Sequence, residues 1–371
     1  MFDFLIYAGV ISSLFFVAPS KVNGNEILTW YLCLLTVISS FFFKKKREVN
    51  LKPLVFLLLY VLVADLPMVS FPPVRHETLN LLIGILSVKI IAERISLSYR
   101  VLGKWLLGLC VFVLVCFVLR YFNIISLFWH ERNPVFGYAS LFSVPWVMGC
   151  AVVMAIPFLY AVHPAALILT LPLIYYSHSS VCFVAAMGEF LALLLVDKKY
   201  KTFAVFSVIV LLAGLYWFGR IDGITEDRFN AWVRSLKYMK YPFTGRGFGT
   251  WAHHGFTLTV GADEYYWNNA HNDFFQWFWE LGWFGIAALL PWYGRLFRAK
   301  GYALVSVAGL ISICFIHAVM HTGQLVFFAI FLIAMAEASL GTRRTDFFPL
   351  VGKIGAFLSA WSKPYLEPKQ E

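Results

Sequence analysis

The stretch Asn268–Gly285, NNAHNDFFQWFWELGWFG, places a candidate acid–base residue at the start of an apolar segment. Polar side chains are costly to bury there unless they form hydrogen bonds. If a helix begins near Asn269, His271 lies in its first turn, where the positive potential of the helix N-terminus favours a neutral imidazole. A neutral imidazole accepts protons, so His271 is a candidate general base. The alternative is a structural histidine satisfied by Asn268 or Asn269.

Helical periodicity predicts which way His271 faces. At about 100° per residue, one meridian of the helix carries His271, Phe275, Phe278, Gly282 and Gly285. Two glycines on one face permit close approach of a neighbouring helix. The spacing therefore predicts that the His271 face looks into a helix bundle.

Composition indicates a membrane protein. Of the 371 residues, 60% are hydrophobic and 13% are charged, and the mean hydropathy is +0.75. A soluble domain cannot hide this much apolar surface, so we predict an all-α polytopic membrane protein with a single transmembrane domain over residues 1–371. A membrane-spanning helix needs roughly 20 mostly apolar residues, which gives about twelve candidates. The predicted spans are 2–18, 27–43, 53–72, 79–93, 105–122, 143–162, 164–177, 180–196, 202–219, 273–294, 302–320 and 324–340.

The net charge of +10 follows a topological pattern. Lys and Arg gather in alternate loops, at residues 44–52, 94–104, 198–201 and 295–300 and after residue 340. Cytoplasmic loops of membrane proteins carry an excess of these residues. Both termini are therefore predicted to be cytoplasmic and the other loops to face outward. The charge is explained by topology, so no nucleic-acid partner is expected.

Metal-ligand patterns are weak in this sequence. All six cysteines fall inside predicted spans without CxxC spacing, so neither a disulfide framework nor a zinc site is predicted. His317 and His321 have the i, i+4 spacing of a metal pair, but no third ligand has a matching spacing. No DxD motif is present. We therefore expect no metal and no cofactor. His321 is assigned to the lining of the site, with an ordinary interfacial histidine as the alternative.

Residues 220–272 form one long outward segment that is too rich in aromatic residues for disorder. Near residues 226–240, one helical stripe carries Phe229, Trp232, Val233, Leu236 and Met239. This pattern predicts an amphipathic helix lying on the outer membrane face. Gly245, Gly247 and Gly249 follow, and their conformational freedom favours a nest of backbone amides that binds an anion beside Arg246.

Arginine is frequent on the segments predicted to face outward. These arginines are Arg75, Arg132, Arg220, Arg228, Arg234 and Arg246. Guanidinium groups bind phosphate oxygens through paired hydrogen bonds. Outward acidic residues are sparse, so arginine, and not a divalent metal, would stabilise a departing diphosphate. Together with a candidate base at His271, these charges predict a lipid-linked phosphate or diphosphate substrate.

Three motifs, in one order, resemble the O-antigen ligase/polymerase superfamily. They are R-x3-W at Arg228–Trp232, P-x2-G-x-G at Pro242–Gly247, and AHND-x2-Q-x3-ELG-x2-G at Ala270–Gly285. The segment that begins at His271 and Asn272 matches the HN-x9-GxxG pattern of the ligases. About sixty residues carry the resemblance, and the long outward loop and the predicted spans agree with it.

The resemblance implies a metal-independent membrane glycosyltransferase of the C type in the bacterial inner membrane, with its site facing the periplasm. In such enzymes an acceptor sugar hydroxyl attacks the anomeric carbon of a glycan held on undecaprenyl diphosphate. His271 would be the base or the acceptor-orienting group, and Asn272 an orienting group at the helix mouth. Arg228 would hold the diphosphate, assisted by Arg132 or Arg246. Arg220 is also assigned to substrate binding.

Two positions depart from the ligase pattern. Ile286-Ala287 stands where many ligases have a small pair, and Ser177-His178-Ser179-Ser180 stands where an earlier span often carries SR. The preferred interpretation is an O-antigen ligase with a lipid A-core acceptor, working among membrane lipids. A polymerase with a second lipid-linked glycan as acceptor is the alternative. A transporter of the same glycan is more remote, since transporters show repeated halves and broken helices at mid-membrane.

Overall fold

A computed structural model describes residues 1–15, 24–50, 52–66, 72–122, 145–177, 179–208, 224–251, 257–260, 263–266, 270–315, 317, 319–321 and 323–340. The first half of the chain forms α1 (Phe2–Phe15), α2 (Gly24–Ser39), α3 (Lys52–Asp65), α4 (Pro72–Arg94), α5 (Tyr99–Tyr121) and α6 (Pro145–Val162). The 3-10 helix η2 (Pro164–Leu169), α7 (Thr170–Tyr176), α8 (Ser180–Val196) and α10 (Ile224–Lys237) follow. The last part holds α11 (Asp273–Leu296), α12 (Tyr302–Cys314), the 3-10 helix η4 (Val319–His321) and α13 (Gly323–Leu340).

The fold is helical, as predicted, with one small exception. Strands β1 (Thr257–Val260) and β2 (Asp263–Tyr266) pair antiparallel as a hairpin inside the long outward segment. Every predicted span overlaps a helix, although the ninth is described only through residue 208. Among the described residues, one helix, at Tyr99–Leu119 within α5, is long and apolar enough to cross a membrane by length and composition, and the other apolar helices there are shorter. The count of twelve spans and their topology therefore stay predictions.

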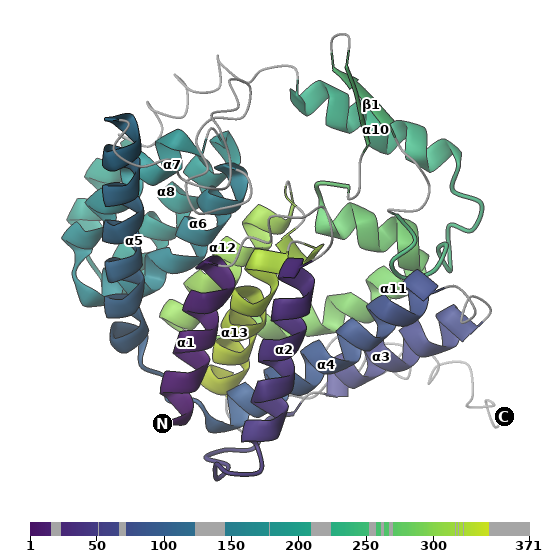
Figure 1. Ribbon diagram of the computed structural model, residues 1–371, viewed down its shortest axis with the longest axis horizontal. Coiled ribbons are helices and arrows are strands. Elements are labelled where there is room, and N and C mark those ends of the chain that lie inside the picture. The colour runs from purple at the N-terminus through teal and green to yellow at the C-terminus, as the bar shows by residue number, and fades with distance from the viewer. Residues whose placement is uncertain are drawn as a thin grey trace, which may run out of the picture.

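Two helices form the centre of the bundle. Residues 147–160 of α6 and 327–338 of α13 are buried without interruption. A helix that is apolar on all sides belongs in such a position. Helices α5, α8 and α12 pack on α6, while α1, α2 and α4 pack on α13. Figure 1 shows α1, α13 and α2 side by side in the middle of the body, with α5 on one flank and α3 on the other.

The outer helices present apolar faces to their surroundings. Along α3 an exposed stripe consists of Val55, Phe56, Leu59, Leu62 and Val63. A similar stripe on α5 consists of Val111, Phe112, Val115 and Val118. Such extended exposed apolar surface is rare on soluble monomers and marks a membrane or protein contact. Both stripes agree with the membrane protein that the composition predicts.

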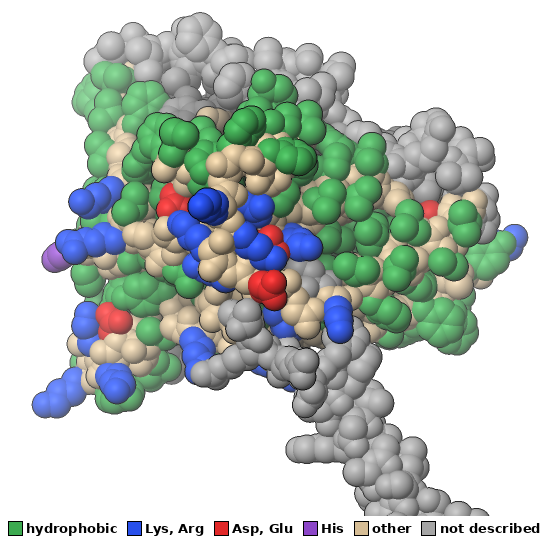
Figure 2. All heavy atoms as spheres, turned by 90° about the horizontal axis from the view of Figure 1, so that it is seen from below, with side chains coloured by type: hydrophobic (Ala, Val, Ile, Leu, Met, Phe, Trp, Pro, Cys, Tyr) green, Lys and Arg blue, Asp and Glu red, His purple; other side chains and the backbone are tan. Residues whose placement is uncertain are grey.

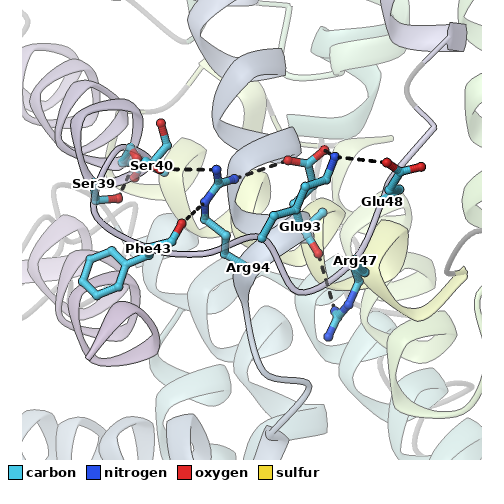
Figure 3. Close-up of polar contacts among 10 residues, drawn as sticks. Ser39, Ser40, Phe43, Arg47, Glu48, Glu93 and Arg94 are labelled. Atoms are coloured by element: carbon cyan, nitrogen blue, oxygen red, sulfur yellow. Dashed lines mark hydrogen bonds and ion pairs between the residues drawn. The ribbon is translucent and has the colours of Figure 1, made fainter.

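The end of α4 is tied to the basic loop that follows α2. The amides of Lys46 and Arg47 donate to the carbonyl of Glu93 at 2.9 and 3.1 Å. Arg94 donates to the carbonyl of Phe43 at 3.0 Å, and Figure 3 shows it reaching across to this loop. The first two bonds satisfy the Glu93 carbonyl near the end of α4, and the basic loop places cations at the negative end of this helix. The loop's positive charge thus has a structural role in addition to the topological role that the sequence predicts.

Three more loops that are predicted to be cytoplasmic, at residues 94–104, 198–201 and 295–300, lie at the same end of the bundle. Asp197, at the end of α8, accepts hydrogen bonds from the hydroxyls of Tyr160 (3.0 Å) and Tyr302 (3.2 Å). Tyr99 stacks on the ring of Phe158 at 4.7 Å and meets the ring of Tyr302 at 5.6 Å. Figure 2, which views the body from below, shows Lys and Arg side chains gathered on that face. The arrangement agrees with the predicted topology.

Cysteine labelling checks this topology. In spheroplasts, Lys46→Cys should resist a membrane-impermeant maleimide until the membrane is permeabilised, whereas Tyr238→Cys, in the outward segment, should react at once. The background should be low because all six native cysteines are buried. Labelling of residue 46 in sealed spheroplasts would contradict the whole topology.

Two buried acids orient helices within the bundle. Glu337 of α13 forms an ion pair with Arg295 of α11 at 2.9 Å, and both side chains are buried. Glu189 of α8 packs against Gly309 of α12, where an added Cβ would lie 1.7 Å from the Glu189 carboxyl. Losing one partner of a buried ion pair leaves an uncompensated charge, so the Arg295–Glu337 pair fixes how α11 meets α13.

Candidate functional site

The segment Ala270–Asp273 forms the mouth of α11. Asn272, and not a residue near 269, is the N-cap: its side chain accepts a hydrogen bond from the Phe275 amide at 2.9 Å. His271 therefore lies just before the helix, and the prediction that it occupies the first turn is wrong. Its φ of 51° is in the left-handed region. Such conformations cost on the order of 1–3 kcal/mol in residues other than glycine and cluster at functional sites.

The ring of His271 contacts the first of two further rings, those of Trp146 and His317, which come from distant parts of the chain. Trp146, in the first turn of α6, meets the His271 ring edge-on, with 5.9 Å between centroids. On Trp146 also lies His317, with stacked rings 4.8 Å apart and 2° from parallel. Ser179, the N-cap of α8, hydrogen-bonds to Nε2 of His317 at 3.0 Å. Trp146, Ser179 and His317 thus fix the surroundings of His271.

Asp273 ties the segment between α12 and α13 to the same mouth. Its side chain is fully buried, and it accepts a hydrogen bond from the Met320 amide at 3.0 Å. Because Met320 lies in η4, this bond holds η4 beside the start of α11. The backbone of His321 is in η4 as well, whereas its side chain lies outside the described residues.

Helix α10 is anchored to the mouth of α11 through an aromatic platform, formed by Trp232, Trp251, Phe275 and Trp279. The indole of Trp232 donates to the Ala270 carbonyl at 2.8 Å and stacks on Phe275 at 5.5 Å. The predicted single stripe is divided: Trp232 packs on the platform, while Phe229 is 62% exposed. The exposed row, which Val233 and Leu236 continue, suits contact with the membrane surface.

The predicted arginines fall into two groups. Arg132 and Arg220 lie outside the described residues. Arg228 lies in α10, four residues before Trp232, and its side chain is also outside them. Arg246 is described: it donates to the Tyr238 carbonyl and lies over the Trp279 ring at 5.4 Å. Arg246 is therefore in contact with Tyr238 and with Trp279 of the aromatic platform.

The glycine loop, residues 242–251, already binds anions, and they are the chain's own carboxylates. Gly245, Gly247 and Gly249 have φ values of 75°, 101° and 78°. The Phe248 amide donates to Asp65 at 3.0 Å, and the Trp251 amide donates to Glu280 at 3.1 Å. The amides of Gly245 and Gly247, in the expected nest, donate to the carbonyls of Tyr241 and Glu280 at 2.7 and 2.9 Å, so they too are bonded within the protein. This corrects the prediction of a free anion-binding nest beside Arg246.

The same loop fills a break in α11. At Gly282 (φ 67°, ψ −170°) the helix is interrupted, so neighbouring backbone groups lose their usual partners. The Trp283 and Phe284 amides donate to the carbonyls of Pro242 and Phe243, both at 3.0 Å, and the Glu280 carbonyl accepts from Gly247 at 2.9 Å.

The two glycines below His271 have different neighbours. An added Cβ on Gly282 would lie 2.4 Å from the Phe243 backbone, and one on Gly285 would lie 3.2 Å from the ring of Tyr60 in α3. Gly282 thus accommodates the glycine loop, and the prediction of a neighbouring helix at this position is wrong. At Gly285 a helix does approach, as predicted. The motif around Pro242 and the motif around Gly282 therefore pack against each other and are joined by backbone hydrogen bonds.

Sequence reasoning missed Trp146, Ser179, Asp273 and Asp65 as members of this region. Two signals were available: Ser179 lies in the segment that departs from the ligase pattern, and Asp273 lies in the AHND motif two residues after His271. Trp146 and Asp65 are separated from His271 by long stretches of chain, and no local spacing links them to it.

Comparison with known families assigns part of the chain. Residues 165–290, about a third of the chain, match the family model described as O-antigen ligase. No curated protein matches the chain. The match confirms the resemblance predicted from the motifs and supports a ligase- or polymerase-type membrane enzyme of O-antigen biosynthesis. It includes α10, the glycine loop and His271, and it excludes Arg132 and His321.

Proposed function

We propose that this protein, within which residues 165–290 match the O-antigen ligase family, transfers a glycan from undecaprenyl diphosphate to a sugar hydroxyl of lipid A core at the periplasmic face. The observation that carries the proposal is the position of His271. It has a left-handed backbone at the mouth of α11, where α6, α10 and η4 meet. A candidate base held at such a junction suits a reaction between two bulky substrates that approach from outside.

The proposed reaction follows from these groups. His271 accepts the proton of the acceptor hydroxyl as that oxygen bonds to the anomeric carbon of the donor glycan. The bond from the anomeric carbon to the diphosphate oxygen breaks, and undecaprenyl diphosphate leaves with the bonding electrons. Arg228, with Arg132, Arg220 or Arg246, stabilises the developing negative charge, so no divalent metal is required in the chemical step. Asn272 caps α11 and thereby sets the position of His271.

The broken helix α11 raises the transporter alternative again, because transporters use half-helix N-termini to bind anionic substrates. After the break in α11, the amides of Trp283 and Phe284 have no acceptor within the helix. They donate instead to the carbonyls of Pro242 and Phe243. They are not available to a substrate, so the break serves packing of the glycine loop. This observation favours the enzyme over the transporter.

Deletion in the native host with gel analysis of lipopolysaccharide tests the proposal. We expect loss of all core-attached glycan while lipid-linked polymer still accumulates. Core that bears a single repeat unit would assign the chain to the polymerase alternative. Loss of core-attached glycan with the donor confined to the cytoplasmic leaflet would assign it to the transporter alternative.

Arg228→Ala should weaken donor binding. A lost charge-assisted paired contact costs about 1.5–3 kcal/mol, or about 10- to 150-fold in kcat/KM for the lipid-linked donor. Arg228→Lys should also be impaired, because lysine keeps the charge but loses the planar fork. Arg234→Ala, an exposed position on the same helix, is the matched control and should stay near wild type. Wild-type turnover by Arg228→Ala in a purified assay removes this arginine from the site.

A further inference from the structure

A second set of functional groups lies behind the Trp146–His317 stack. Cys150 of α6, Cys182 of α8 and His317 offer donor atoms that all lie within 4.8 Å of one another. The two Sγ atoms are 3.7 Å apart. All three side chains are almost completely buried, with exposed fractions of 0%, 0% and 3%. These residues are far apart in sequence, so only the fold brings them together.

The distances suit a metal ion better than a disulfide. A disulfide needs Sγ atoms about 2.05 Å apart. Two thiolates on one tetrahedral Zn²⁺ at Zn–S distances of about 2.3 Å have sulfurs about 3.8 Å apart. The observed 3.7 Å agrees with the second geometry. A small movement of the His317 ring would bring its nitrogen to the distance of a third metal ligand.

The hydrogen bonds of His317 leave one nitrogen for a ligand. Nε2 is bonded to Ser179 at 3.0 Å, whereas Nδ1 is buried and has no hydrogen-bond partner among the described residues. Metal-bound histidines regularly bond their second nitrogen to a polar neighbour in this way, which fixes the ring. Ser179 thus has the position expected of such a neighbour.

Charge favours a divalent ion at this buried position. Two thiolates and a neutral imidazole balance the charge of Zn²⁺, so the complex is neutral and avoids the cost of a buried net charge. Thiolate and imidazole donors also select zinc over magnesium or calcium, which prefer oxygen. We propose that Cys150, Cys182 and His317 bind one Zn²⁺ ion that joins α6, α8 and the segment after α12 behind the site.

The ion has a positioning role. Binding releases the two thiol protons and holds His317 against Trp146, the ring that meets His271. The ion is separated from His271 by Trp146, so the proposed transfer chemistry remains metal-independent. A failure of this proposal would leave the proposed transferase activity untouched, because its test measures bound metal.

Metal analysis of the purified full-length protein tests the proposal. After purification without chelator and incubation with ZnSO₄, we expect about one zinc per chain by mass spectrometry. Cys150→Ser and Cys182→Ser should lose this zinc. Cys110→Ser, which changes a buried cysteine of α5, is the matched control and should keep it. Equal zinc in wild type and Cys182→Ser, or no zinc in wild type, would overturn the proposal.

Two further measurements do not depend on the stability of variants. Co²⁺ added to wild-type protein should produce thiolate-to-cobalt charge-transfer absorption, and its absence contradicts the site. Thiol titration in denaturant with chelator should find all six cysteines reduced. Four titratable thiols would show a disulfide instead and would overturn the zinc assignment.

Discussion

His271→Ala should lower turnover by about 10²–10⁴-fold, the usual range for a lost general base, while the protein stays inserted and folded. The imidazole is half-buried against Trp146, so its removal leaves a space at the mouth of α11. Alanine also accepts the left-handed backbone at residue 271 less readily than histidine, at a cost of on the order of 1 kcal/mol. The loss should therefore appear in kcat at saturating donor and acceptor, with a small change in thermal stability.

The control for this variant is His163→Ala. That histidine lies at the opposite end of α6, where its Nδ1 accepts a hydrogen bond from the Ala165 amide. It should retain near wild-type turnover. A near-normal rate for His271→Ala with both substrates saturating would return His271 to the structural alternative, a histidine that only completes the mouth of α11.

Gly282→Ala should destabilise the protein and lower turnover at least about tenfold. The residue has a φ of 67°, and an added Cβ would lie 2.4 Å from the Phe243 backbone. The left-handed conformation and the overpacking together cost about 2–5 kcal/mol. The strain should push the glycine loop away from α11, and small misplacements near a site can cost about 10²-fold in rate. Thermal unfolding in detergent and a purified transfer assay measure the two effects.

The matched control lies in the same helix. Among the described residues, no atom comes within 4 Å of a Cβ added to Gly294, and the backbone there is helical. Gly294→Ala should therefore leave activity unchanged and raise stability by about 0.5–1 kcal/mol. If both alanine variants behave alike, Gly282 is not needed for the close approach of the glycine loop to α11, and that packing is wrong.

Much of the framework could be predicted because hydropathy and periodicity are local properties. The α6, α8 and α13 spans were predicted within about two residues of their observed bounds, since long apolar runs have few alternatives in a membrane. His271, Asn272 and Gly282 were also visible in the sequence as parts of one motif, and the structure places them at the mouth and at the break of α11.

The roles of those residues were less predictable. The helix start moved to Asp273 because Asn272 caps the amide of Phe275, and this took His271 out of the helical periodicity. Gly282 looked like a site of helix packing, but its partner is a loop almost forty residues earlier. Cys150, Cys182 and His317 share no local pattern, so only tertiary structure could bring them together.

The carboxylates of Asp65 and Glu280 that bind the glycine loop are part of the same polymer as the amides they occupy. A tethered group acts at a high effective concentration, millimolar or above, and does not diffuse away. Free phosphate or the diphosphate of a lipid would have to displace these tethered acids before it could reach the amides of Phe248 and Trp251. Discrimination among anions therefore falls mainly to the guanidinium groups, where inorganic phosphate in the surrounding medium should compete.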